Sequence, residues 1–513
     1  MHFSRYIRYW AHYRASEPAF VCGEERLSWR EYADQCASLA LALRDMGLEP
    51  GDRLGCLLPN SMQWCVAFGA AALAGAPLVP LNPGFGASEL RAIVEDSDCK
   101  LVVSTAELMS RLGRPQRADD AAAVRVFRPG EPAAPAAASS AVDALRGNAT
   151  LADLPAADLD EDAALVIGYT SGTTGLPKGA VLTHRGVAEV THGLAHALDW
   201  TAGERFLVLA PLAFTGGVIL NLASNVVTGG TAFIETRLVP DEVLAHIAER
   251  RISVAICVPV IWQRIAEAPA FAQADIRCLK SAITGGAPVS AALLKRYLDK
   301  GVVVRQAYGC TEAAGAIAMP DAASARARPG SCGRALVGID LELRDLNGAP
   351  TAPGEVGEIC VRGPQVMQAY WNNPKATADA LAGGWYRTGD LARLDEGGAL
   401  VIVDRKKSMI ISGGVNVYPA EVERAMSAID GVLEVAVFGV PSAEWGEQVV
   451  ALVHGKALDS AVVGERAREL LGSMKAPKQV LLATGPLPKT ASNKIARHHL
   501  AALYAQLCSQ GAA

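Results

Sequence analysis

A glycine-rich run directly behind a short apolar segment constrains this chain more than any other feature. Residues 163–168 read AALVIG, a composition typical of a buried strand, and residues 169–180 continue as YTSGTTGLPKGA. Glycine lets backbone N–H groups turn toward one anion, and further donors come from Ser171, Thr173, Thr174 and Lys178. A strand that leads into such a loop predicts a polyphosphate site.

A polar surface turn is the ordinary alternative for a cluster of Gly, Ser and Thr. The common phosphate loop GxxxxGK[ST] does not fit, because no Ser or Thr follows Lys178. The order SGTTGLPKG nevertheless resembles the signature of the adenylate-forming superfamily, which contains acyl-CoA synthetases, nonribosomal peptide adenylation domains and luciferases. The resemblance implies that ATP is bound by Thr170, Ser171, Gly172, Thr173, Thr174 and Lys178.

Composition limits the alternatives. The chain has 513 residues, of which 50% are hydrophobic and 20% charged, so we expect a globular protein with more than one core. A net charge of −5 gives no global field for nucleic acid, and an anionic ligand therefore needs a local site. Eleven cysteines without a CxxC pair argue against a disulfide framework or a zinc site. Without a signal peptide or a run of 18 apolar residues, we expect a cytoplasmic protein with no transmembrane segment.

Strand-like and helix-like segments alternate between Leu27 and Thr105, which predicts parallel sheets covered on both faces. Farther along, the apolar runs 206–210, 253–259, 279–283 and 302–304 read as strands. We expect an α/β fold with a large N-terminal domain of several subdomains and a small, mobile α+β C-terminal domain. The Ala- and Pro-rich stretch 129–140 receives no function.

A polar run follows each of the last two predicted strands: residues 285–288 follow 279–283, and residues 306–312 follow 302–304. Residues 306–312 read QAYGCTE, in which Tyr308 offers a flat face for a purine, Thr311 a hydroxyl for a phosphate oxygen and Glu312 a hard carboxylate for Mg²⁺. The order Y-G-x-T-E is similar to the superfamily's adenine and magnesium motif, and GGAP at 285–288 to its adenine-edge motif. The resemblance implies nucleotide contacts from Gly285, Gly286, Ala287, Pro288, Tyr308, Gly309 and Thr311, and it makes Glu312 and Thr173 catalytic metal ligands.

The ribose site is predicted around Asp390. Residues 354–363 (GEVGEICVRG) and 384–390 (GWYRTGD) resemble two further superfamily motifs. One carboxylate can accept from both ribose hydroxyls, whereas the alternative is an ordinary Asp in a Gly-bounded turn. By the same resemblance Arg405 contacts the nucleotide and Lys407 is the hinge residue. The implied domains are 1–403 and 408–513, joined by a hinge at 404–407, and the effect of Ser408, where relatives often have Asp, stays open.

The C-terminal domain carries two further sites. Gly413 and Gly414 give a loop that can lie close to a slender ligand, and we assign them to the path of coenzyme A. Residues 487–495 (LPKTASNKI) resemble the motif P-[KR]-T-x-x-G-K, which implies that Lys494 is catalytic rather than a solvated surface lysine. Asn493 replaces the usual Gly, but Asn also tolerates a left-handed backbone.

The acyl group is predicted to lie among Ala213, Phe214, Gly216, Trp262, Gly285, Cys310 and Ala313. Phe214 occupies a position where relatives often have His, and plain core packing is its alternative role. The only ionisable groups in the runs that border this pocket are Cys310 and Glu312, so a second carboxylate on the substrate would be buried unpaired. The sequence therefore favours an apolar monocarboxylate, either a medium-chain fatty acid or an aromatic acid.

The resemblance implies an ATP-dependent carboxylate–CoA ligase, most similar to bacterial enzymes of this class. The carboxylate and ATP give acyl-AMP and pyrophosphate, and CoA then gives acyl-CoA and AMP. ATP, Mg²⁺, CoA and a small carboxylate are the expected ligands, without nucleic acid, and both a monomer and a homodimer are open. The alternatives are an enzyme that loads a carrier-protein thiol and a nucleotide switch that only hydrolyses ATP.

Overall fold

A computed structural model describes residues 1–112, 124–127, 149–154, 160–170, 177–345, 347–442, 444–489 and 495–511. The chain divides into two compact units. The first comprises Met1–Leu341 and Val361–Tyr386, and the second comprises Glu342–Cys360 and Arg387–Ala513. The predicted hinge at 404–407 falls inside the second unit by this division, and its role as a hinge stays a prediction.

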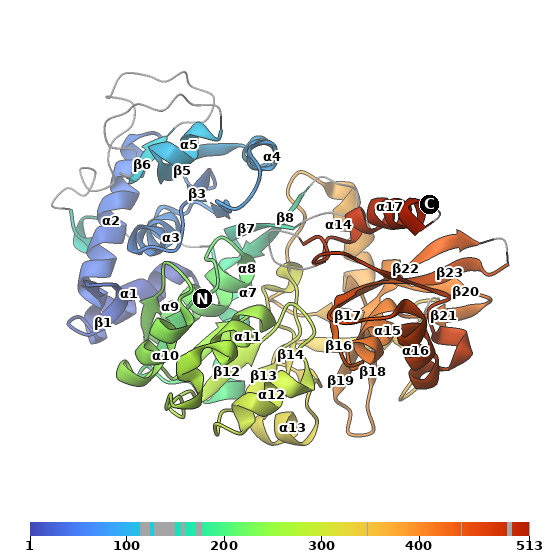
Figure 1. Ribbon diagram of the computed structural model, residues 1–513. Coiled ribbons are helices and arrows are strands. Elements are labelled where there is room, and N and C mark those ends of the chain that lie inside the picture. The colour runs from blue at the N-terminus through green and yellow to red at the C-terminus, as the bar shows by residue number, and fades with distance from the viewer. Residues whose placement is uncertain are drawn as a thin grey trace. The chain divides into compact units, whose positions relative to one another are not determined.

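A seven-stranded sheet forms one half of the first unit (Figure 1). All its neighbouring strands are parallel except the pair β1 and β2. The order is β13 (Val304–Gln306), β12 (Ser281–Thr284), β11 (Val254–Cys257), β9 (Arg205–Val208), β10 (Thr231–Ile234), β1 (Pro18–Cys22) and β2 (Glu25–Ser28). Apolar side chains of α10, α11 and α12 form one core with this sheet.

A six-stranded sheet forms the other half of the first unit. Its four inner strands are parallel, and an antiparallel strand closes each edge. The order is β6 (Val124–Phe127), β5 (Cys99–Thr105), β3 (Arg53–Leu57), β4 (Leu78–Pro80), β7 (Ala164–Thr170) and β8 (Lys178–Thr183). Helices α4 and α5 contribute to the core beside this sheet.

Several helices of the first unit begin at a residue whose side chain caps them. Ser28 and Glu31 form a capping box at α2, and the Thr183 hydroxyl, at the end of β8, accepts the Gly186 N–H in the first turn of α7. The α-helices are α1 (Phe3–Tyr13), α2 (Trp29–Asp45), α3 (Met62–Ala74), α4 (Ala87–Ser97), α5 (Ala106–Ser110), α7 (His184–Leu198), α8 (Thr215–Gly217), α9 (Ser224–Thr228), α10 (Pro240–Glu249), α11 (Pro259–Glu267), α12 (Ala291–Leu298), α13 (Ala322–Ala327) and α14 (Pro374–Ala380).

Shorter elements complete the first unit. Residues Val218–Ala223 between α8 and α9 form a π-helix, η3. The 3₁₀ turns are η2 (Leu151–Asp153), η4 (Pro269–Ala272), η5 (Thr311–Ala313) and η6 (Ala382–Gly384), and a two-stranded ribbon pairs β14 (Ala318–Met319) with β15 (Arg334–Ala335).

The second unit is α+β. One sheet has the order β16 (Asp340–Arg344), β17 (Gly357–Arg362), β18 (Tyr386–Leu394) and β19 (Leu400–Arg405). The other joins β21 (Val415–Val417), β20 (Ile410–Ser412), β23 (Gly446–Gly455) and β22 (Val432–Ser442), with β24 (Gln479–Leu482) parallel to β23. The remaining elements are η7 (Lys406–Ser408), α15 (Pro419–Met426), α16 (Ser460–Lys475), η8 (Arg497–His499) and α17 (Leu500–Gly511).

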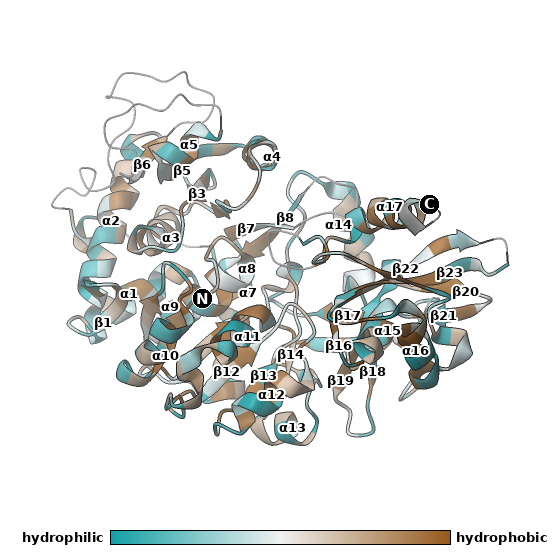
Figure 2. Ribbon diagram, viewed as in Figure 1, coloured by the Kyte–Doolittle hydropathy of each residue, from teal (hydrophilic) through white to brown (hydrophobic). Residues whose placement is uncertain are grey.

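The long hairpin of β22 and β23 supplies the apolar centre of the second unit and is largely brown in Figure 2. Its inward residues pack with α15 and α16. The predicted fold class is confirmed: α/β, with parallel-type sheets in a large N-terminal part and a smaller α+β C-terminal part.

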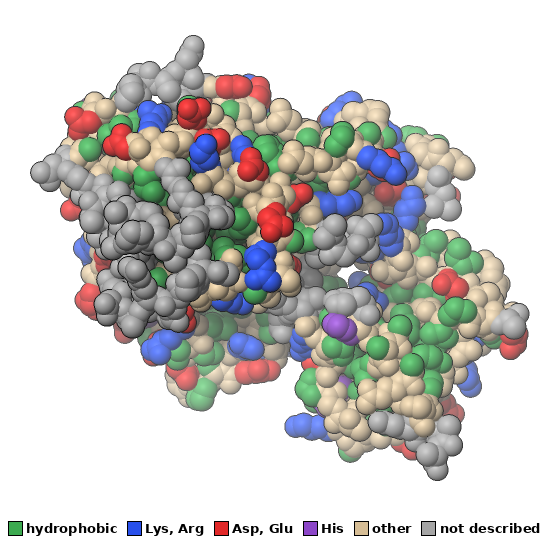
Figure 3. Space-filling model, turned by 90° about the horizontal axis from the view of Figure 1, so that it is seen from above, with side chains coloured by type: hydrophobic (Ala, Val, Ile, Leu, Met, Phe, Trp, Pro, Cys, Tyr) green, Lys and Arg blue, Asp and Glu red, His purple; other side chains and the backbone are tan. Residues whose placement is uncertain are grey.

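Charged side chains of both signs occur on the surface shown in Figure 3. Among the helices that the structure describes, none is both long enough and apolar enough to cross a bilayer.

Candidate active site

The predicted phosphate loop connects β7 to β8. Thr170 and Lys178 are paired across this hairpin, and the Thr170 hydroxyl donates to the Lys178 carbonyl at 3.5 Å. Both residues are half-buried. The predicted ligands Ser171, Gly172, Thr173 and Thr174 lie outside the described residues, so the structure locates this site by its two ends.

Residues 367–371 run beside β8 and extend the hairpin. Val181 N–H donates to the Ala369 carbonyl at 2.9 Å, and Gln368 N–H donates back to the Val181 carbonyl at 2.9 Å. Farther along, Trp371 N–H donates to the Gly179 carbonyl at 2.7 Å. The ring of Tyr370 is thereby placed 5.3 Å from the Lys178 ammonium, a cation–π distance.

Glu312 is held twice by this same segment. Its backbone carbonyl accepts the Met367 N–H at 2.7 Å, and its carboxylate oxygen Oε1 accepts the Tyr370 hydroxyl at 2.8 Å. Burial, followed by the negative charge and the hydrogen bond of Glu312, raises the pKa of Tyr370 well above its usual range. Tyr370 therefore stays protonated and donates to the carboxylate at neutral pH.

A second tyrosine, Tyr386, is buried in the same environment. Burial raises its pKa far above the usual range, and the nearby groups Cys310 and Glu312 add to the shift. Its phenol is a permanent hydrogen-bond group rather than an acid at neutral pH. Lys178, Glu312, Tyr370 and Tyr386 thus form one polar cluster in the first unit.

The two adenine runs follow the carboxyl ends of β12 and β13. Ala307 N–H donates to the Thr284 carbonyl at 2.8 Å, so residues 284–288 and 306–312 leave the sheet side by side. Gly285 and Ala287 are half-buried, whereas Gly286 and Pro288 are exposed. Carboxyl ends of parallel strands are where open α/β sheets bind ligands.

Close packing explains the glycine of the Y-G-x-T-E motif. A Cβ at Gly309 would collide with the carbonyl of Gly315, which the chain reaches after a left-handed turn at Ala314. Tyr308 is buried, and it exchanges backbone hydrogen bonds with residues 317 and 318. The run is therefore a rigid support for Thr311 and Glu312.

The end of β7 meets both polar runs. A Cβ at Gly168 would lie 2.7 Å from the Thr215 hydroxyl and 2.9 Å from the Thr311 methyl group. The end of β7, the start of α8 and the run 306–312 consequently converge at Gly168.

Several predicted acyl residues lie beyond this point. Half-buried Phe214 meets Phe85 edge to face with ring centroids 6.2 Å apart, and a Cβ at Gly216 would have no neighbour within 4 Å. Leu220 of the π-helix approaches Gly315, where a Cβ would meet it at 3.1 Å. Ala313 is fully buried, whereas Ala213 and Cys310 are half-buried.

Trp262 sits in the core between α11 and α12. It is only 1% exposed, its Nε1–H donates to the Ile283 carbonyl at 3.0 Å, and its ring meets Tyr297 edge to face. Its part in an acyl pocket stays a prediction.

In the second unit, Asp390 pairs with Arg405 across β18 and β19. The Arg405 Nε lies 3.0 Å from the Asp390 carboxylate, which is buried, whereas Arg405 is exposed. Gly389, with φ of 72°, donates its N–H to Glu358 at 3.2 Å, and the same carboxylate accepts Lys406 at 3.0 Å. Glu358 therefore supports both the ribose motif and the start of the predicted hinge, where Lys407 is exposed.

Gly413 and Gly414 are the two central residues of the tight hairpin between β20 and β21. Their φ angles are 56° and 79°, which glycine adopts without steric cost and which a hairpin turn of this type requires at both positions. Both are exposed. Lys494 lies outside the described residues, but Lys489 and Ile495 on either side are paired as an antiparallel bridge.

A comparison with known families identifies the chain. Residues 7–371 match the AMP-binding enzyme family, and residues 421–494 match the AMP-binding enzyme C-terminal domain. The chain belongs to the AMP-binding enzyme family. The predicted resemblance to adenylate-forming enzymes is confirmed.

Relatives within this family span nearly the whole chain. A feruloyl-CoA synthase of an Amycolatopsis species is 37% identical over 479 residues, covering 92% of this chain and 93% of its own. A long-chain-fatty-acid–CoA ligase of Mycobacterium tuberculosis is 36% identical over 466 residues, covering 90% of each chain. The ATP-bound structure of MatB from Rhodopseudomonas palustris matches with a TM-score of 0.87 at 28% identity, covering 98% of this chain and 99% of that one.

These findings confirm the predicted enzyme class, an AMP-forming acid–thiol ligase of the acyl-CoA synthetase type. The protein is thus a carboxylate–CoA ligase that uses ATP and CoA.

Sequence reasoning missed Leu220, Tyr370 and Tyr386 in the first unit and Glu358 in the second. Tyr370 follows a recognisable motif, but nothing local shows that its segment pairs with β8. The partner of Glu312 is 58 residues away in the chain, a distance at which spacing carries no signal.

Proposed function

We propose that this protein joins an apolar monocarboxylate, medium-chain or aromatic, to coenzyme A through an acyl-adenylate. The observation that supports this most strongly is the polar cluster of Lys178, Glu312 and Tyr370, which lies beside the ends of the phosphate hairpin. An anion-binding loop, a carboxylate and a cation in one place suit the transfer of an adenylyl group.

The protein has to supply positioning and charge neutralisation, because the substrate carboxylate can itself attack the α-phosphate. Donors of the 170–178 hairpin would hold the phosphates, Tyr308 and residues 285–288 the adenine, and Asp390 with Arg405 the ribose. Lys494 would bring the carboxylate and the α-phosphate together. The carboxylate–phosphorus bond forms as the bond to pyrophosphate breaks.

Mg²⁺ fits the donor set of the first unit. Among the described residues no cluster of three His, Cys, Asp or Glu side chains exists that could hold a metal alone. A single carboxylate such as Glu312, with Thr173 as the predicted hydroxyl ligand, suits Mg²⁺, which takes one or two carboxylates and fills its shell with substrate phosphates and water. When bound, the ion would neutralise charge on the phosphates.

The acyl group is inferred from the side chains around Phe214. Phe85 and Phe214 offer flat apolar walls, and Gly216 leaves space beside them. The relatives named for feruloyl-CoA and long-chain fatty acids are consistent with an aromatic or fatty acid. In the second half-reaction the thiol of CoA would approach the acyl-adenylate along Gly413 and Gly414. A carrier-protein thiol is the alternative acceptor.

Pyrophosphate release tests the proposal. It is measured with acetate, malonate, octanoate, benzoate and cinnamate, each with and without CoA. We expect release to require an acid, to favour octanoate, benzoate or cinnamate, and to continue beyond one turnover only with CoA. Preference for acetate or malonate would contradict the proposed pocket, and release without any acid would indicate an ATP-hydrolysing switch.

Lys494→Ala separates the two half-reactions. The variant lacks the cation that would hold the α-phosphate, so we expect the rate of adenylation to fall about a hundredfold or more. The rate of thioester formation from supplied acyl-AMP and CoA should stay near that of the wild type. Equal losses in both steps would contradict the role given to Lys494.

A further inference from the structure

Two ion pairs fix the chain on either side of residues 490–494. On the entry side, the Lys489 ammonium lies 2.6 Å from Glu434, and the Leu487 N–H donates to the other oxygen of that carboxylate at 2.7 Å. On the exit side, Arg497 donates to both oxygens of Glu423 at 2.8 and 3.0 Å. These contacts lie within the second unit.

The two ends are also joined to each other. Lys489 and Ile495 form an antiparallel bridge, and Ala496 N–H donates to the Pro488 carbonyl at 2.8 Å. Residues 487–489 and 495–497, which we call the base of the segment that carries Lys494, are therefore joined to each other. Fixing this base limits where the five intervening residues can reach, because each residue spans at most about 3.6 Å.

Glu434 and Glu423 connect this base to the same strand. Glu434 is part of β22, and Glu423 of α15 accepts the N–H of Val437 in β22 at 2.8 Å. Arg497 donates in addition to the Val437 carbonyl at 2.8 Å. The base of the segment is thus mounted on the rigid central hairpin, and not on another loop.

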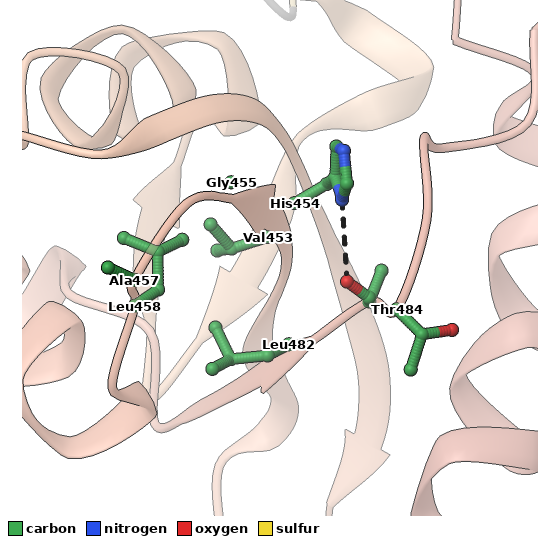
Figure 4. Close-up of a pocket in the computed structure, with 8 residues that line it drawn as sticks. Val453, His454, Gly455, Ala457, Leu458, Leu482 and Thr484 are labelled. Atoms are coloured by element: carbon green, nitrogen blue, oxygen red, sulfur yellow. Dashed lines mark hydrogen bonds between the residues drawn. The ribbon is translucent and has the colours of Figure 1, made fainter.

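His454, the strand partner of Glu434, makes a further contact in this part of the second unit. His454 pairs with Glu434 across β22 and β23, and its imidazole lies 3.4 Å from the Ala483 carbonyl. A dashed line from His454 marks this hydrogen bond in Figure 4. His454 and Ala483, but not Glu434, border a hollow of about 380 Å³ that is otherwise lined mainly by aliphatic side chains.

The Glu434 carboxylate is charged in this setting. Burial alone would raise its pKa, but the hydrogen bonds from Lys489 and Leu487 outweigh burial, and the pKa is lowered. Only 19% of the side chain is exposed, so this pair differs from the fully solvated pairs that contribute little.

We propose that Glu434 is a positioning residue for the adenylation step, because through Lys489 and Leu487 it fixes the entry to the segment that carries Lys494. The inference rests on the proposed function. Glu434 itself touches no substrate in this account; its effect is on where the Lys494 ammonium can lie, and small misplacements of a reacting group are costly.

Glu434→Gln tests the inference in the full-length protein. Glutamine keeps an acceptor for the Leu487 N–H and removes the charge that holds Lys489. With cinnamate or octanoate, whichever the wild type turns over faster, we expect kcat for ATP–pyrophosphate exchange to fall about tenfold. KM for ATP and thioester formation from supplied acyl-AMP should stay within about twofold, because neither depends on Lys494 in this account.

Two further variants keep the test decisive. Lys489→Met removes the same pair from the other side and should reproduce the loss, whereas Lys489→Arg keeps the pair and should retain most of the exchange activity. The matched control is Glu421→Gln, which removes the 2.7 Å ion pair between Glu421 and Lys475. This pair is in the second unit and joins α15 to α16, and it does not involve residues 487–489 or 495–497. Glu421→Gln should leave exchange unchanged.

The inference and the proposed function fail in different ways. Acid-dependent exchange that is abolished by Lys494→Ala but unchanged by Glu434→Gln would overturn only the inference. Equal losses of exchange and thioester formation in Glu434→Gln, or the same loss in Glu421→Gln, would reduce Glu434 to a structural role and also overturn it. A wild-type protein without acid-dependent exchange would overturn the proposed function.

Discussion

Glu312 illustrates how one side chain is prepared for a task before any ligand arrives. Its backbone carbonyl and its carboxylate are both engaged by residues 367–370, so the side chain does not have to be ordered when substrate binds. Preorganised charge of this kind is a large contribution to catalysis by electrostatic stabilisation. The hydroxyl of Tyr370 is the group that fixes the carboxylate.

Tyr370→Phe isolates that hydroxyl, because phenylalanine keeps the ring that lies near Lys178. A hydrogen bond to a charged group contributes about 1.5–3 kcal/mol, so we expect adenylation kcat to fall about tenfold. The Mg²⁺ concentration for half-maximal rate should rise, because the freed carboxylate is no longer held in one orientation. A titration of pyrophosphate exchange with Mg²⁺ measures both.

Tyr6→Phe is the control for this change. It removes a tyrosine hydroxyl that is hydrogen-bonded to His192 at 3.0 Å, on α1 and away from Glu312. Its kinetics should match the wild type. Wild-type Mg²⁺ dependence in Tyr370→Phe would show that Glu312 is positioned by its backbone alone.

At the scale of elements, α1 is attached to α7 by an unusual contact. The rings of His2 and His184 are stacked 3.6 Å apart, both are buried, and the Phe3 N–H donates to His184 Nδ1 at 3.2 Å. Burial lowers the pKa of His184 well below its usual range. Because α7 follows β8 directly, this contact joins the N-terminal helix to the end of β8, the strand that follows the predicted phosphate loop.

The same contact predicts acid sensitivity. Burial, then the positive charges of Arg5 and the α-amino group, lower the pKa of His2 to about 4, against the opposite effect of Glu161 and Asp160. An unfolded histidine titrates near 6.5, so between pH 6.5 and 4 the unfolded chain binds a proton that folded His2 does not. Stability should therefore fall as the pH drops through this window.

His2→Phe keeps an aromatic ring and removes the titrating group. We expect the Tm of the wild type to drop between pH 7 and 5, and the drop in His2→Phe to be smaller by a few degrees. His12→Phe, an exposed histidine of the same helix, should behave like the wild type. Identical slopes for all three proteins in differential scanning calorimetry would show that the contact does not govern acid stability.

Local patterns predicted the elements well and their partners poorly. The expected strands at 206–210, 253–259 and 279–283 overlap β9, β11 and β12, because buried apolar runs bounded by turn residues carry their own signal. The π-helix at Val218–Ala223 was not predicted, because its apolar run carries no local signal that distinguishes a π-helix from an α-helix.

The candidate site shows the same division. Glu312, Asp390 and Gly309 could be selected from ordered motifs, whereas the strand-like pairing of residues 367–371 with β8 joins segments far apart in the chain. The glycine pair at 413–414 is predicted to lie on the path of CoA, and the structure adds a backbone reason, since both positions of this two-residue hairpin have positive φ. Trp262 is predicted to border the acyl pocket, but its side chain is buried against Ile283 of β12 and Tyr297 of α12, which local sequence does not show.

At the scale of the whole molecule, the residues assigned to one reaction are divided between two compact units. The phosphate hairpin and Glu312 belong to the first, whereas Asp390, Arg405, the glycine hairpin and the base of the Lys494 segment belong to the second. Adenylation takes place at the α-phosphorus and thioester formation at the acyl carbon, so the two steps need different protein groups. A chain that changes its backbone between the two steps can present them in turn.

Lys407→Pro tests this alternation. Proline fixes φ near −65°, lacks an N–H and restricts the preceding residue, and Lys407 lies in the exposed turn Lys406–Ser408 behind β19. We expect the variant to be held in one state, so that one half-reaction keeps a rate near the wild type and the other falls about a hundredfold. Lys407→Ala removes the side chain but leaves the backbone free, and both of its half-reactions should stay near the wild-type rates. The two half-reactions are measured separately, as ATP–pyrophosphate exchange and as thioester formation from supplied acyl-AMP. Normal rates for both steps in Lys407→Pro, or equal losses in both, would place the change of backbone elsewhere in the chain.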